Sequence, residues 1–218
     1  MKARLFALAA MLALSAASAA APAAAQPRAS SAAKPAPTAA QAAMIADAEA
    51  FARALTEDAT KALTDASLSR EAQLEKFQDV LAEGLALDTI GRFMLGDKRR
   101  TMTAAQIARY DAVFPDYITK LYAEQFDEIV GRPLEVRESR ALNARDVIVR
   151  TQFKRSSGAP ILVDWRVRKL KDGGQKMIDI IVSGVSIMLV KREEFSAFIA
   201  ANGVDALLDR LEQEARSA

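Results

Sequence analysis

The stretch QKMIDIIVSGVSIMLVKREEF, residues 175–195, decides the fold of this chain. Its first half places Ile178, Ile180 and Val182 at a spacing of two residues, which is the pattern of a strand with one face directed at an interior. Asp179 lies between them and belongs to the opposite face. We therefore expect the last strand of a sheet here.

The strand pattern breaks at Ser183-Gly184 and resumes from Ser186 to Leu189. A glycine inside such a run predicts a bulge or a bend where a side chain would not fit. The sequence then turns basic and amphipathic, so we expect a closing helix that starts near Arg192.

Three segments ahead of this strand also alternate, at residues 134–139, 145–154 and 160–170, and turn sequences rich in Ser and Gly separate them. Together with residues 175–182 they predict a four-stranded antiparallel meander. One face is apolar, with Val147, Val149, Thr151 and Phe153 in one strand and Ile161, Val163, Trp165 and Val167 in the next. The opposite face is basic, with Arg150, Lys154, Arg166 and Arg168. A sheet with one apolar face needs helices to cover it.

The first half of the chain has helical spacing. Two apolar stripes predict helices, through Ala48, Phe51, Leu55, Ala59 and Leu63 and through Leu74, Phe77, Leu81 and Leu85. Ser69 opens the second of these helices. A short helix over residues 87–95 should end at Gly96.

A capping box formed by Thr103 and Gln106 predicts the start of a long helix that reaches about residue 130. This helix carries a ridge at four-residue intervals, formed by Tyr110, Phe114, Ile118, Tyr122 and Phe126. Pro115 lies within it and should bend it. We expect the ridge to cover the apolar face of the sheet. Further helices are predicted over residues 192–201 and 205–215.

The fold class is therefore α+β, with helices enclosing a strongly curved four-stranded antiparallel sheet. Such an arrangement either packs solid or keeps a cavity, and the pattern of residues leaves both options open.

The N-terminus has the features of a secretory signal peptide. Lys2 and Arg4 precede an apolar run of ten residues, which is too short to span a bilayer, and Ala23 and Ala25 form an A-x-A site. Such a signal peptide would direct the chain to the periplasm and would be removed by cleavage after Ala25 or nearer Ala19. We expect residues 1–25 to be the signal peptide and residues 26–40, rich in Ala, Pro and Ser, to be a flexible linker.

A single domain is then expected over residues 41–215. Its helical part covers about residues 41–131, its sheet part about 132–190 and its C-terminal helices about 191–215. No Cys is present to accept a lipid anchor.

Composition excludes several chemistries. The chain has no His and no Cys, so catalytic triads, thiol nucleophiles, structural zinc and disulfides are unavailable. Loss of Lys2 and Arg4 with the signal peptide takes the 30 basic residues to 28, which equals the 28 acidic residues. A neutral chain gives no electrostatic basis for binding nucleic acid.

Residues 175–195 resemble the C-terminal signature of the MlaC family of periplasmic phospholipid-binding proteins. That signature is an aromatic-Asp-aliphatic run, then Gly-Val-Ser, an aliphatic pair, a basic residue and Phe. Residues 95–126 also resemble the family, through Leu-Gly, a Thr-x-x-Gln helix start and aromatic or aliphatic residues at four-residue spacing. The resemblance covers nearly all of residues 43–212 in order. It departs where the family has aromatic residues, at Arg99, Gln175 and Ile178.

The resemblance implies a cone similar to the NTF2-like architecture, with a cavity that holds phospholipid acyl chains and a head group near the mouth. It implies a component of the Mla, or toluene-tolerance, transport system that maintains outer-membrane lipid asymmetry. Such carriers exchange lipid with an outer-membrane lipoprotein complex and an inner-membrane ABC transporter carrying an MCE-domain protein. The resemblance implies no enzyme activity, no cofactor and no metal, and we expect a monomer.

The residues expected to line the cavity are Phe77, Leu81, Phe93, Phe114, Ile118, Tyr122, Phe126, Val147, Val149, Val163, Trp165, Val167, Ile180, Val182, Val185 and Ile187. Ser186, Lys191 and Arg192 are expected at the head-group rim or on a partner surface.

Three alternatives to a phospholipid carrier remain open. One is a periplasmic adaptor with a solid core that acts by protein contact alone. Another is an enzyme of similar shape, for which Asp164 and Asp179 would form the acid-base pair. The third is a carrier whose cargo is a hopanoid or another polycyclic lipid.

Overall fold

The computed structural model describes residues 36–126, 132, 134–155 and 158–216, without the side chains of residues 124–126. By its internal contacts the chain divides into Met1–Ala36 and Pro37–Ala218, and the fold described below is that of the second unit. The expected signal peptide and most of the expected linker lie outside the described residues.

The sheet is antiparallel throughout, and its five strands follow one another in sequence order. They are β1 (Leu134–Ala141), β2 (Asp146–Phe153), β3 (Ile161–Lys169), β4 (Gln175–Val182) and β5 (Val185–Ser186). The α+β class is as expected, and β1 to β4 coincide with the four predicted strands to within two residues. The predicted number of strands is wrong by one, because the two residues of β5 pair with Ile181 and Val182 of β4.

The turn between β4 and β5 consists of Ser183 and Gly184, which both have positive φ, at 50° and 87°. Positive φ at both central residues is the requirement of a type I′ hairpin. A Cβ added at Gly184 would meet nothing within 4 Å, so the backbone conformation, not lack of space, requires the glycine. Of the predicted bulge or bend, the structure has the bend, a two-residue turn that reverses the chain, and no bulge at this position.

A bulge does occur earlier in β4, where Arg166 pairs with Asp179 while Val167 pairs with Met177. Ile178 is the additional residue. Met177 therefore joins the apolar face, together with Ile180. The predicted placement of Ile178 on that face is wrong because the bulge shifts the alternation by one residue.

Strand β1 forms an edge of the sheet among the described strands, and its register with β2 also shifts, between Val136 and Glu138. Half of its eight residues are charged, namely Glu135, Arg137, Glu138 and Arg140.

The helices are α1 (Ala39–Thr64), α2 (Arg70–Gly84), α3 (Leu87–Leu95), the 3₁₀ helix η1 (Gly96–Thr101), α4 (Ala104–Phe126), α5 (Ile187–Asn202) and α6 (Val204–Arg216). The predicted capping box of α4 is confirmed, because the Gln106 amide N–H donates to Thr103 Oγ1 and the Thr103 N–H donates to Gln106 Oε1. Ser69 caps α2 and Gly96 ends α3, also as predicted. The predicted start of α5 is wrong, because the helix begins at Ile187 rather than near Arg192.

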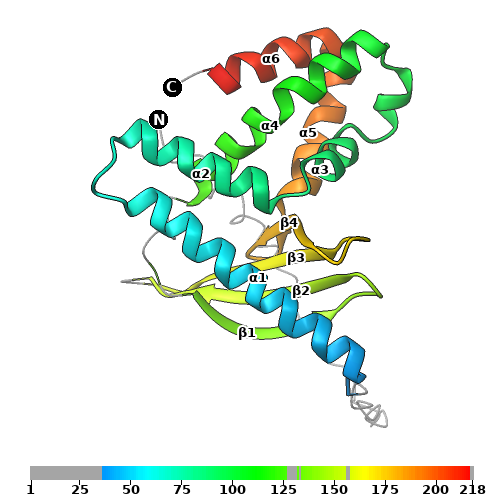
Figure 1. Ribbon diagram of the computed structural model, residues 1–218. Helices are drawn as coiled ribbons and strands as arrows, with labels where there is room; N and C mark the ends of the chain where they lie inside the picture. The colour runs from blue at the N-terminus through cyan, green and yellow to red at the C-terminus, as the bar shows by residue number, and fades with distance from the viewer. Residues whose placement is uncertain (1–35, 127–131, 133, 156–157, 217–218) are drawn as a thin grey trace, which may run out of the picture. The chain divides into compact units, whose positions relative to one another are not determined.

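Helix α1 packs across β1, β2 and β3, whereas α2, α3 and α5 contact β4 (Figure 1). Helix α4 packs mainly against α2, α3 and α6. The expectation that the aromatic ridge of α4 covers the sheet is therefore wrong, and α1 covers most of the apolar face instead.

Candidate ligand-binding site

The structure brings eleven of the sixteen expected lining residues into one buried apolar cluster. They are Phe77, Leu81, Phe114, Ile118, Tyr122, Val147, Val149, Val163, Trp165, Val167 and Ile180. Phe93, Val182 and Ile187 are partly buried against this cluster. Val185 is 55% exposed and stands outside it. The side chain of Phe126 lies outside the described residues.

The sheet contributes its inner face through side chains that lie opposite one another across β2, β3 and β4. Val149 pairs with Trp165, and Trp165 pairs with Ile180. The polar atoms on this face are satisfied, since Trp165 Nε1 donates to Thr151 Oγ1 at 2.8 Å and Thr151 Oγ1 donates to the Val163 carbonyl at 2.7 Å. The inner face therefore presents an apolar surface to the helices.

Ridge residues of α4 pack against α3, and Tyr117, which lies beside the ridge, contacts α5. Tyr110 stacks on Phe114 at 5.1 Å between ring centroids, and Tyr117 lies 5.8 Å from Phe195 of α5. Phe114 fits against Gly91 of α3 so closely that an added Cβ would lie 3.0 Å from the ring. The absence of a side chain at Gly91 therefore lets Phe114 of the ridge pack closely against α3, and a larger residue at position 91 would prevent this contact.

Tyr122 is the exception among the polar groups of the cluster. The residue is 1% exposed, and its hydroxyl has no hydrogen-bond partner in the described part of the chain. Burial raises the pKa of Tyr122 well above its ordinary value, and the negative charge of Asp179 raises it further. An unpartnered buried hydroxyl costs about 1–3 kcal/mol. A ligand atom that accepts this hydrogen bond would recover that cost.

Two polar residues of the segment 175–195 stabilise the start of α5, namely its N-cap Ser186 and Asp179 of β4. Ser186 Oγ accepts the Leu189 N–H at 3.1 Å and donates to Asp179 Oδ2 at 2.6 Å. Asp179 also accepts the Met188 N–H at 3.3 Å. Burial raises the pKa of the Asp179 carboxyl, although these hydrogen bonds oppose the shift. A carboxylate and a hydroxyl at a helix N-terminus stabilise the helix, so the Ser186 contacts are those of a cap.

The two basic residues expected at the rim have partners within α3 and α5. Lys191 forms an ion pair with Glu194 at 2.8 Å, and its side chain is only 12% exposed. The Arg192 guanidinium lies 4.7 Å above the centre of the Phe93 ring. The Lys191–Glu194 pair lies within one turn of α5, whereas the Arg192–Phe93 contact joins α5 to α3. The placement of Lys191 and Arg192 at the head-group rim or on a partner surface stays a prediction.

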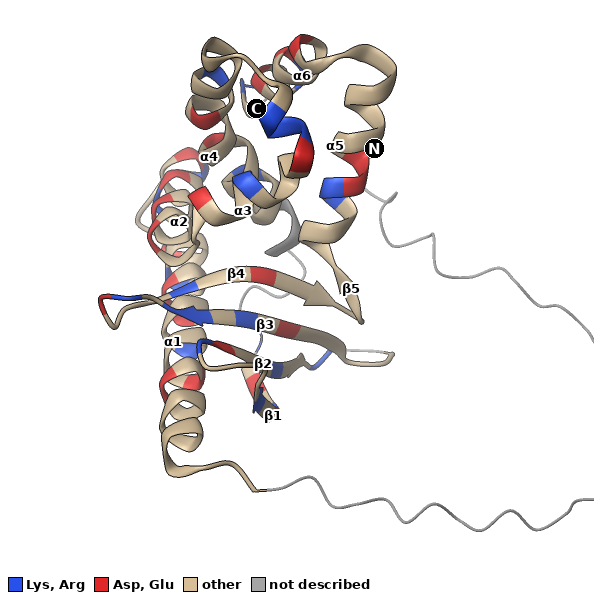
Figure 2. Ribbon diagram, turned by 90° about the vertical axis from the view of Figure 1, so that its right-hand side faces the viewer, with Lys and Arg blue, Asp and Glu red and all other residues tan. Residues whose placement is uncertain are grey.

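The outer face of the sheet is charged, as Figure 2 shows along β3. Asp146 is 1% exposed and accepts hydrogen bonds from Arg168 Nε and Arg166 Nη2, both at 2.7 Å. The Arg168 guanidinium, followed by that of Arg166, holds the pKa of the Asp146 carboxyl far below its ordinary value. Arg150 binds Asp164 with two nitrogens, at 3.0 and 2.9 Å. The basic residues of this face therefore have carboxylate partners.

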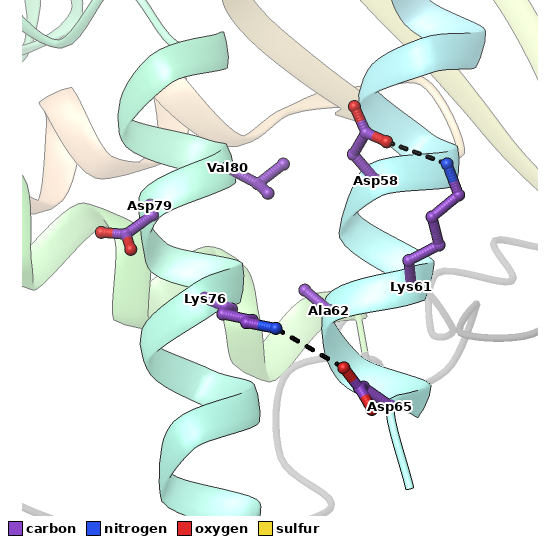
Figure 3. A pocket seen from close by; sticks show the side chains of 7 residues that line it. All are labelled: Asp58, Lys61, Ala62, Asp65, Lys76, Asp79 and Val80. Carbon is purple, nitrogen blue, oxygen red and sulfur yellow. Dashed lines mark hydrogen bonds and ion pairs between the residues drawn. The ribbon is translucent and has the colours of Figure 1, made fainter. Parts of the chain in front are cut away.

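A cleft of about 310 Å³ lies between α1 and α2 (Figure 3). Its walls are mostly charged: Lys76 pairs with Asp65 at 3.5 Å, and Lys61 pairs with Asp58 at 3.2 Å. Only Ala62 and Val80 of the residues in Figure 3 are apolar. This cleft lacks the chemistry for acyl chains.

The described residues hold no group of three or more His, Cys, Asp or Glu that could bind a metal ion. In the same part of the chain, no helix combines the length and the apolar character needed to cross a bilayer.

A model of the family described as "MlaC protein" matches residues 53–213, which is well over half of the chain. The chain belongs to the MlaC family. One curated relative is the intermembrane phospholipid transport system binding protein MlaC of Haemophilus influenzae, with 24% identity over 132 residues. This match covers 59% of the chain and 62% of the relative, so the chain spans less than two thirds of that relative's length.

A solved structure shares the fold of this MlaC family member. It is the phospholipid-binding protein from Ralstonia solanacearum in complex with a phospholipid, with a TM-score of 0.65 and 21% sequence identity. The similarity covers 77% of this chain and 96% of the Ralstonia chain.

Sequence reasoning missed several residues of the buried cluster. Met177, Phe195 and Leu208 are at most 2% exposed and belong to it. The helical spacing of Leu207, Leu208 and Leu211 would have predicted that α6 adds these residues to the buried cluster. The bulge that directs Met177 inward left no signal in the sequence.

Proposed function

We propose that this chain is a periplasmic carrier that holds phospholipid acyl chains between the inner face of the sheet and the helices that cover it. Membership of the MlaC family carries this proposal. The Ralstonia neighbour, described in complex with a phospholipid, supports the choice of ligand. The continuous apolar cluster that spans the helices and the sheet supplies the required kind of surface.

The energetics favour a carrier of this kind. Each methylene group is worth about 0.8 kcal/mol on leaving water, so a bare two-chain lipid in the periplasm would cost roughly 20 kcal/mol or more. An apolar interior offsets most of that cost. Because interior and bilayer are similarly apolar, exchange between them is nearly balanced, and direction must come from the partners. The carrier itself needs no catalytic residue.

We further propose the partners and the route. Residues 1–25 act as a cleaved signal peptide, and the mature protein exchanges lipid with an outer-membrane lipoprotein complex. At the inner membrane it meets an ABC transporter that carries an MCE-domain protein. N-terminal sequencing of the exported protein tests the first step, and an N-terminus other than residue 26 would move the cleavage site.

Native mass spectrometry of the protein purified from periplasm without detergent tests the function. The carrier predicts a discrete adduct with the mass of a phospholipid, and lipid extraction identifies the class; a hopanoid would appear there as a different mass. A clean apo mass without uptake from liposomes would contradict the proposal and favour the solid-core adaptor.

A matched pair of substitutions tests the proposed lining. Val149 is fully buried on the inner face, whereas Leu162 is 44% exposed on the outer face of the neighbouring strand. Val149→Thr adds one hydroxyl to the inner face and should reduce lipid occupancy at least twofold, while Leu162→Thr should leave it unchanged. Equal occupancy in both variants would contradict the assignment of Val149.

A further inference from the structure

Tyr122 differs from the other buried donors whose contacts the structure defines. Tyr110 Oη donates to the Gly91 carbonyl at 3.1 Å, and Trp165 Nε1 donates to Thr151 Oγ1. Thr119, in the same helix as Tyr122, donates to the Pro115 carbonyl at 2.8 Å. Buried polar atoms in proteins are satisfied as a rule, so an exception calls for a partner that is not part of the protein.

Three other buried side-chain atoms lack a partner among the described residues: Ser139 Oγ, Arg166 Nε and Gln175 Oε1. Each belongs to a side chain that is partly exposed, so a small movement brings the atom to water. Tyr122 alone of the four is buried throughout its side chain, at 1% exposure. Tyr122 belongs to the apolar cluster, and its hydroxyl is buried there without a partner among the described residues.

We propose that the Tyr122 hydroxyl donates a hydrogen bond to an ester carbonyl of the bound phospholipid and selects for ester-linked lipids. This inference rests on the proposed carrier function. The ester carbonyls are the first polar atoms above the acyl chains. A lipid whose chains lie in the cluster therefore brings these acceptors to its boundary.

The charge around Tyr122 favours a carbonyl over the phosphate as the acceptor. Asp179 accepts hydrogen bonds from Ser186 Oγ and the Met188 N–H, and its carboxylate would repel a phosphate placed beside Tyr122. Burial keeps the hydroxyl protonated at physiological pH, so it remains a neutral donor. A neutral donor in an apolar site matches a neutral acceptor, because no charge then has to be desolvated.

Competition between two lipids tests the proposal. The protein is incubated with vesicles that contain equal amounts of diester and diether phosphatidylcholine of the same chain length, and native mass spectrometry measures the ratio bound. The wild type should take up the diester lipid in about fivefold excess, the value of one neutral hydrogen bond. Tyr122→Phe, which keeps the ring, should bind both lipids equally.

Tyr110→Phe is the matched control, because it removes a hydroxyl that has a partner in the protein. It should lower the thermal midpoint and retain the ester preference, while Tyr122→Phe should leave the midpoint unchanged or raise it. A wild type without ester preference, or a Tyr122→Phe variant that keeps the preference, would overturn the inference and leave the carrier function standing. Uptake of neither lipid by the wild type would overturn both.

Discussion

At the scale of single residues, the buried carboxylate of Asp146 contributes to the response of stability to pH. Its pKa is lower in the folded chain than the ordinary value of 3.8, so its contribution is present in full above that value. The contribution is lost as the pH falls below 3.8, because the unfolded chain takes up the proton first.

Asp146→Asn should therefore lower the free energy of unfolding at pH 7 by about 1–3 kcal/mol. This is below the range for fully buried pairs, since the Arg166 and Arg168 side chains are 32% and 27% exposed. Urea denaturation should show that the difference in free energy of unfolding between variant and wild type is smaller at pH 3 than at pH 7. Asp97→Asn, whose partner Arg100 is 80% exposed, is the control and should change little. An equal gap at both pH values would show that Asp146 is not the linked group.

Ser186 provides a second test at this scale. Ser186→Ala removes the cap of α5 and the donor to Asp179, and should cost about 1 kcal/mol in urea denaturation. Ser196→Ala, in the middle of the same helix, should leave stability unchanged or raise it slightly, because Ala is the better helix former. Equal effects of the two substitutions would argue against a capping role.

At the scale of elements, the hairpin between β4 and β5 can be strengthened or weakened through its two turn residues. Ser183 has a φ of 50°, which Asn adopts more readily, so Ser183→Asn should raise the free energy of unfolding by a few tenths of a kcal/mol. Gly184→Ala should lower it by about 1–2 kcal/mol, because φ is 87° there. Thermal midpoints measure both changes, and a stabilising Gly184→Ala would contradict the turn type.

The positions of helices and strands could be predicted where the sequence showed a single clear pattern of apolar residues or a helix cap. The strict alternation of Val147, Val149, Thr151 and Phe153 located β2, and the Thr103-x-x-Gln106 box located the start of α4. The run from Ile187 to Val190 is apolar and short, which suits a strand or a buried helix equally, so the start of α5 could not be predicted. Four-residue spacing identified the aromatic ridge, but spacing within one helix carries no information on which element it meets.

The candidate site shows the same limit. Strand periodicity was sufficient to place Val149, Val163 and Trp165 on one buried face. It could not show that Val185 would be exposed, because that depends on the hairpin reversing the chain at Ser183-Gly184. Nor could it show that the Tyr122 hydroxyl would lack a partner, since this depends on contacts between distant segments.

At the scale of the whole molecule, one continuous cluster connects residues from α1 to α6 with the inner face of the sheet. Residues 37–218 should therefore unfold in a single transition. Trp165, the one tryptophan of the sequence, reports on the sheet from a buried position, while far-UV circular dichroism reports mostly on the helices. Urea transitions followed by the two probes should coincide. Separate midpoints would mean that the helices and the sheet unfold independently.

The edge strand β1 bears on behaviour at high concentration. An exposed strand edge is a template on which a second chain can add by main-chain hydrogen bonds, and such growth leads to fibrils. In β1 the irregular register after Val136 interrupts the run of N–H and C=O groups, and a copy added in parallel register would place like charges side by side at residues 135, 137, 138 and 140. The strand that forms the edge of the sheet in one chain thus disfavours the parallel, in-register stacking of many chains on which cross-β fibrils are built.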